Sequence, residues 1–190
     1  MEPMIRGYSI KQQLHFLEQC EPEALRRWLA TVPSDVKSTL DSLKAAEWYP
    51  RKYSVDILRA IAAHHGSDER ATYAAMVHCG TFIAEEATNT FLKLLMKVLT
   101  PALFAKKIPE FWKRDHTRGR FEVNTAGAKA GSLEFELQDV EGFDHIGVVG
   151  IGWMTFGFNA MGKSDVVVTQ TGWSLATPGP ANVRYRVRWS

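Results

Sequence analysis

Cysteine is scarce in this sequence: Cys20 and Cys79 are the only two among 190 residues. Two cysteines cannot form a disulfide framework or a four-cysteine zinc site, so we expect two free thiols in a protein of the reducing cytoplasm. A charge excess is lacking as well, because 23 Lys and Arg against 21 Asp and Glu leave a net charge of +2. So small an excess argues against a dedicated nucleic-acid binder.

Long hydrophobic runs are also missing. The first ten residues mix charged and apolar side chains, so we expect no secretory signal. The longest uncharged run, residues 146–162, has 17 residues and includes five glycines. A membrane span needs about 20 mostly apolar residues. The run therefore predicts a buried core helix and no membrane span.

The first two thirds of the chain predict helices, because apolar residues recur there at helical spacing. Ser9, Pro22, Pro33-Ser34 and Ser54 are candidate starts, and Pro50 and Gly66 are candidate stops. We expect the following segments: a helix from Ser9, one from Pro22, one from Ser34 to residue 47, one from Ser54 to Gly66, one from residue 68 to 99 and one from residue 101 to 114.

After Gly119 the pattern changes to alternation. Apolar and polar residues alternate in four segments, which we expect to be strands: residues 120–124, 132–138, 166–171 and 182–189. The uncharged helix lies between the second and third strands. This order predicts an α+β fold in which the helical two thirds pack on a small, mostly antiparallel four-stranded C-terminal sheet with one buried Gly-rich helix.

One motif invites a nucleotide-binding interpretation. Residues 157–164 match G-x-x-x-x-G-K-[ST] letter for letter. A phosphate loop needs a strand before it and a helix after it, whereas here a helix precedes and a β-branched segment follows. We therefore expect a helix C-terminus at Gly162, with no nucleotide bound at Lys163.

The uncharged helix carries apolar residues on more than one face. One stripe consists of Gly147, Gly150, Met154, Gly157 and Met161. The glycines either let a neighbouring element approach closely or leave a cavity; packing is the favoured alternative. A sheet covers only one side of such a helix, so the N-terminal helices or a second copy of the chain must cover the other.

Motifs for catalysis and metal binding are missing. The six histidines are scattered, and the sequence contains no HExxH, CxxC or GxSxG. We therefore expect no enzyme, no catalytic residue and no metal site. Arg184, Arg186 and Arg188 alternate along one strand, and Glu134 and Glu136 along another, so we expect cross-strand ion pairs in preference to an anion site.

The order of several short motifs resembles a known family. These motifs are Trp48-Tyr49-Pro50, residues 106–112, residues 119–123, Gly142 with the Gly-rich helix, and residues 187–189. The chain looks like the uncharacterised myxobacterial branch of the heme NO-binding-like and 4-vinyl reductase-like small-molecule-binding superfamily. The resemblance implies one domain over residues 1–190, with a helical extension over 1–47 and the small-molecule-binding-like core over 48–190. It also implies a pocket between helices and sheet, and pairing through helices.

Heme-binding members of that superfamily use a histidine on a helix and a Tyr-x-Ser-x-Arg motif. That motif does not occur here, although His116 falls in the corresponding region. We therefore expect no cofactor, heme included.

The resulting functional expectation is a non-catalytic sensory or regulatory domain that holds a small hydrophobic ligand. The alternative is a ligand-free adaptor for protein–protein interaction in bacterial signalling. The expected partners are a second copy of the chain and a signalling protein. The candidate pocket residues are Phe91, Trp112, Gly147, Gly150, Met154 and Gly157.

Overall fold

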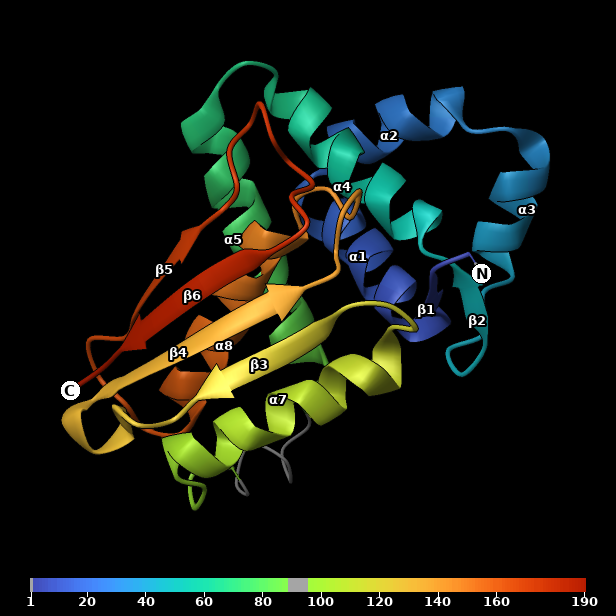
Figure 1. Ribbon diagram of the computed structural model, residues 1–190. Helices are drawn as coiled ribbons and strands as arrows, with labels where there is room; N and C mark the ends of the chain where they lie inside the picture. Colours follow the sequence, from blue (N-terminus) through green and yellow to red (C-terminus); the bar gives the residue numbers. More distant parts are fainter. Residues whose placement is uncertain (1, 89–95) are drawn as a thin grey trace.

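The computed structural model describes residues 2–88 and 96–190 (Figure 1). Helices pack on one four-stranded antiparallel sheet, which confirms the α+β class. The strands of this sheet are β3 (Arg120–Asn124), β4 (Ser132–Gln138), β5 (Val167–Thr171) and β6 (Val183–Arg188), in the order β3-β4-β6-β5. All four predicted strands are therefore present within one or two residues of their expected ends.

The two faces of the sheet differ in polarity, as the alternation predicted. Leu133, Phe135 and Leu137 of β4 are buried on the inner face. On the outer face Arg184 Nε lies 3.1 Å from Glu136 Oε1, and Arg186 Nη2 lies 2.7 Å from Glu134 Oε1. The expected cross-strand ion pairs are thus confirmed.

The buried Gly-rich helix, α8 (Ile146–Ala160), packs against β5 and β6 on one side and against α5 (Glu69–Glu86) on the other (Figure 1). Two glycines make the helix crossing possible. A Cβ on Gly80 would lie 1.9 Å from the Val149 carbonyl oxygen, and one on Gly152 would lie 1.9 Å from the Val77 carbonyl oxygen. The chain's own α5 therefore covers the second apolar side of α8, and that side does not call for a second copy.

The remaining helices surround this centre. They are α1 (Gly7–Cys20), α2 (Pro22–Thr31), α3 (Ser34–Asp41), α4 (Lys52–His65) and α7 (Pro101–Asp115). Proline in the first turn of α2, the Asp68 cap of α5 and the Gly66 end of α4 agree with the sequence analysis. The predicted single helix over residues 68–99 ends at Glu86, and residues 89–95 of that segment lie outside the described structure.

A second, two-stranded sheet was not predicted. Strand β1 (Met4–Arg6) pairs antiparallel with β2 (Trp48–Pro50), so that Ile5 faces Tyr49. The prediction that residues 48–50 end a helix is wrong, since α3 ends at Asp41. Helix α1 begins at Gly7, before Ser9, because the chain leaves β1 there and the Gly7 amide donates to the Glu47 carbonyl at 2.9 Å.

Two further boundaries bear on function. Helix α4 begins at Lys52, so Ser54 is a buried helical residue and does not cap the helix. Helix α8 ends at Ala160, and Gly162, with φ of +77°, turns the chain toward β5. The order helix, Gly-Lys-Ser, strand is therefore opposite to that of a phosphate loop. Within the described residues, none of the helices has the length and apolar character needed to cross a membrane.

Candidate functional site

A cavity of about 220 Å³ lies between α1, α7, α8 and the inner face of the sheet. Its wall is mainly apolar and rich in aromatic side chains. The aromatic members are Phe104, Phe111, Trp112, Phe121, Phe143, Trp153 and Phe156. Apolar walls with a few polar groups are typical of small-molecule sites.

A larger hollow of about 510 Å³ lies over the outer face of the sheet. Its wall includes Glu134, Glu136, Arg184 and Arg186, whose charges neutralise one another in ion pairs. This surface is exposed and polar, so we take the inner cavity as the candidate site.

The structure brings four of the six candidate pocket residues together. Trp112 from α7 and Gly150, Met154 and Gly157 from α8 line the inner cavity. Gly147 does not line it, because the glycine faces β6 and a Cβ there would lie 2.9 Å from Val183 Cγ2. The sixth candidate, Phe91, lies outside the described residues. A ligand-binding role for these residues stays a prediction.

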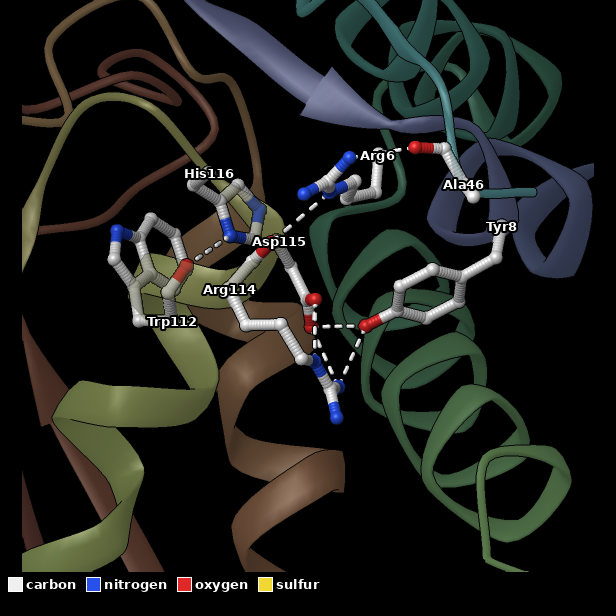
Figure 2. Close-up of polar contacts among 7 residues, drawn as sticks. All are labelled: Arg6, Tyr8, Ala46, Trp112, Arg114, Asp115 and His116. Atoms are coloured by element: carbon white, nitrogen blue, oxygen red, sulfur yellow. Dashed lines mark hydrogen bonds and ion pairs between the residues drawn. The ribbon is translucent and has the colours of Figure 1, made fainter. Parts of the chain in front are cut away.

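His116, at the C-terminal end of α7, also lines the cavity. Its ring stacks on Trp112 with centroids 3.7 Å apart, and its Nδ1 donates to the Trp112 carbonyl oxygen at 3.2 Å (Figure 2). Burial lowers the pKa of His116 to about 4, so the imidazole is neutral at pH 7. With Nδ1 as the donor, Nε2 carries the lone pair, and no residue of the described structure hydrogen-bonds to it.

A polar cluster joins the end of α7 to the start of α1 beside His116 (Figure 2). The Tyr8 hydroxyl donates to Asp115 Oδ2, and Arg114 pairs with Asp115 through Nε at 2.7 Å. Arg114 Nη2 also donates to the Tyr8 hydroxyl at 2.8 Å. Burial, and next the Asp115 carboxylate, raise the pKa of Tyr8 to about 12. The positive and negative charges at this end of the cavity therefore neutralise one another.

Arg6 extends this contact to the connection that precedes β2. Its Nε donates to the Arg114 carbonyl at 3.3 Å and its Nη1 to the Ala46 carbonyl at 2.5 Å (Figure 2). The sequence analysis noted that Asp115 and His116 are adjacent, but it missed Tyr8. Tyr8 and Asp115 are 107 positions apart, and no periodic pattern signals their contact.

Three buried polar atoms on cavity-lining residues have no hydrogen-bond partner: Gln12 Oε1, Gln13 Oε1 and the Tyr185 hydroxyl. Gln13 is 3% exposed and Tyr185 is 2% exposed. Burial raises the pKa of Tyr185, so its hydroxyl stays protonated. Unpartnered buried polar groups are rare in folded proteins and mark places where a further group binds.

Comparison with known proteins rests on structure alone, since no protein-family model and no curated protein sequence matches the chain. An H-NOX protein from S. oneidensis in the Fe(II)NO ligation state is 10% identical, with 98% of this chain and 99% of that chain covered and a TM-score of 0.65. A Cs H-NOX mutant is also 10% identical, with 98% and 97% covered and a TM-score of 0.68. The chain has the H-NOX fold. The predicted resemblance to heme NO-binding proteins is thus confirmed at the level of the fold.

The H-NOX fold corrects the expectation that the chain takes no cofactor. Structures of this fold include one in an Fe(II)NO ligation state and one from a study of heme redox potential through porphyrin distortion, the latter 11% identical with a TM-score of 0.59. These neighbours point to heme. The missing Tyr-x-Ser-x-Arg motif was therefore insufficient ground for excluding it.

The residues of the cavity fit the iron of a heme in one respect. His116 presents a neutral imidazole whose Nδ1–H is held by a backbone carbonyl, which is the arrangement that orients metal-bound histidines. The aromatic wall suits a flat macrocycle. A cavity of about 220 Å³ is below the roughly 300–1,000 Å³ of pockets for drug-sized ligands, so heme requires the walls to separate. Among the residues that the structure describes, no group of three His, Cys, Asp or Glu side chains could hold a bare metal ion.

Proposed function

We propose that the chain is a non-catalytic sensory domain whose cavity between α1, α7, α8 and the sheet binds a small ligand. The observation that carries the proposal is the combination of an apolar aromatic wall with polar atoms that have no partner in the protein. A fully packed adaptor would not leave such atoms beside an unfilled space. The H-NOX fold supports the same conclusion and makes heme the first ligand to test.

With heme, His116 would ligate the iron through Nε2, and the Trp112 carbonyl would hold the imidazole in the required tautomer. Trp112 would also fix the ring plane by stacking. Bound heme would supply an iron centre able to take up a diatomic gas. The chain's own contribution would be the neutral ligand and an apolar wall that excludes water.

Titration of the purified protein with hemin tests this assignment. We expect a saturable Soret band at one heme per chain, and its loss or a marked shift in His116→Ala. The matched control is His78→Ala, since His78 lies on α5 with an exposed side chain away from the cavity. A Soret band that is identical in both variants would refute the role of His116, and absence of any band would refute heme as the ligand.

Native mass spectrometry separates a ligand-binding domain from the adaptor alternative. A non-covalent adduct on the protein purified from cells supports ligand binding. A bare chain that also binds no added ligand supports the adaptor.

We further propose that residues 1–190 form a single domain that includes the N-terminal segment 1–47. Ile10, Phe16 and Leu17 of α1 are fully buried in the same hydrophobic core as α5 and α8, which supports this division. A cytoplasmic location and a signalling protein partner stay part of the proposal. The cluster of Arg6, Tyr8 and Asp115 connects the cavity to the N-terminal strand and offers a route to such a partner.

The homodimer also stays a prediction. Its original basis was the second apolar side of α8, which α5 of the same chain covers. Light scattering measures it directly: a monomer gives a mass near 21.4 kDa, and a dimer gives twice that value.

A further inference from the structure

The unpartnered polar atoms describe the ligand more closely than the fold does. Tyr185, from the centre of β6, places its hydroxyl beneath α8, because a Cβ on Gly150 would lie 2.8 Å from that oxygen. Gly150 therefore makes room for the hydroxyl, and both residues line the cavity. The hydroxyl is buried and unbonded. A bound molecule that offers a hydrogen bond there would remove the cost of burying it unpaired.

A second acceptor comes from another wall of the same cavity. Gln13 of α1 is buried, and its Oε1 has no partner. Tyr185 can donate and accept, whereas an amide oxygen only accepts. A ligand hydroxyl both donates and accepts, so it is the simplest group that suits this pair of side chains.

The charges on the wall exclude an ionised ligand. Arg114 and Asp115 pair with each other, and the His116 ring is neutral. A charged molecule would lose its hydration in the cavity without an opposite charge free to compensate it. The ligand should therefore be neutral at pH 7.

Volume sets the size of the ligand. A 150 Å³ apolar cavity in another protein holds benzene, so in proportion about 220 Å³ holds roughly nine non-hydrogen atoms. The wall contributes Phe104 and Trp153, which stack at 5.7 Å, and Phe111 at their edge. Aromatic side chains at these separations favour a flat aromatic guest.

We propose that the cavity binds a neutral phenol of about nine non-hydrogen atoms, whose hydroxyl pairs with Tyr185 and whose ring lies among the aromatic side chains of α7 and α8. The inference rests on the proposed function only in that the cavity is a ligand site, and it does not require heme. Gln13 accepts the hydroxyl proton or contributes its amide as a second polar contact.

Two probes of equal size test this proposal: 4-ethylphenol, and 4-ethyltoluene, in which a methyl group replaces the hydroxyl. We expect 4-ethylphenol to bind the full chain saturably in calorimetry and to change the fluorescence of Trp112 and Trp153. The hydrocarbon should bind at least fivefold more weakly. Tyr185→Phe should weaken 4-ethylphenol binding about five- to tenfold and leave the hydrocarbon unchanged, because one neutral hydrogen bond is lost. Tyr73→Phe, at a half-buried tyrosine that does not line the cavity, is the matched control.

The outcomes separate the two proposals. No saturable binding of 4-ethylphenol at millimolar concentration, or equal affinity for the two probes, overturns the phenol assignment. An unchanged preference in Tyr185→Phe overturns the role of Tyr185. Phenol binding without a Soret band removes heme and keeps the ligand site, whereas failure of both hemin and phenol removes the proposed function.

Discussion

The crossing of α5 and α8 allows a sharp test of the fold. In Gly80→Ala the new Cβ would lie 1.9 Å from the Val149 carbonyl oxygen, whereas real Cβ atoms keep at least 3.0 Å. The helices must therefore separate by roughly 1 Å. The neighbour is backbone, so no side chain can rotate away to relieve the contact.

The expected cost follows from two opposing effects. Alanine in place of a helical glycine favours the helix by about 1 kcal/mol. Overpacking of a tight core costs about 1–3 kcal/mol, and more where rigid backbone is forced apart. We therefore expect Gly80→Ala to lower the free energy of unfolding by about 2 kcal/mol net, and Gly152→Ala to do the same at the facing position.

Urea denaturation of the full chain measures this difference through the midpoint at constant slope. The control is Gly157→Ala in the same helix α8, where the new Cβ would meet the far end of the Phe104 ring. That ring can shift, so the control should change stability by less than about 1 kcal/mol. If Gly80→Ala is as stable as the parent chain, the close backbone crossing described here is wrong.

Three further predictions concern single side chains. Because the pKa of His116 is about 4 in the folded chain and about 6.5 when unfolded, the unfolded state takes up the proton first; stability should fall by up to about 3 kcal/mol as pH drops from 6.5 to 4, and His116→Phe should flatten this part of the pH profile in urea titrations. Tyr185→Phe without ligand should keep or raise the melting temperature, because it removes an unpaired buried hydroxyl; a loss above about 1 kcal/mol would show that the hydroxyl has a partner in the protein. Arg186→Ala should cost less than about 1 kcal/mol, and the cost should shrink in 1 M salt, since both partners of the Glu134 pair are half-exposed; a cost of 2 kcal/mol or more would contradict this account.

The sheet could be predicted from the sequence because its signal is local. Leu133, Phe135 and Leu137 alternate with polar residues, and the structure buries exactly that set on the inner face. Helix ends set by a single residue, such as Asp68 and Gly66, were equally readable. In each case the deciding interaction spans only a few positions along the chain.

The site was less accessible because it depends on distant contacts. The pairing of β1 with β2 joins residues more than 40 positions apart, and three-residue strands carry too little alternation to be recognised. The glycine stripe of α8 correctly indicated close approach, but it could not separate Gly147, which faces β6, from Gly150 and Gly157, which line the cavity. That distinction depends on the direction in which each turn of the helix faces.

The glycine crossing also determines which walls of the cavity can move. Helices α5 and α8 touch backbone to backbone, so they behave as one stiff beam, and the sheet is fastened to it through β5 and β6. The opposite wall is held differently: α7 meets the N-terminal strand through the side chains of Arg6, Tyr8 and Arg114. Side-chain hydrogen bonds exchange with water and reform at little cost, whereas interlocked backbones do not. A guest larger than the resting cavity would thus gain its space by swinging α7 outward from a fixed frame, and the N-terminal strand would feel that displacement first.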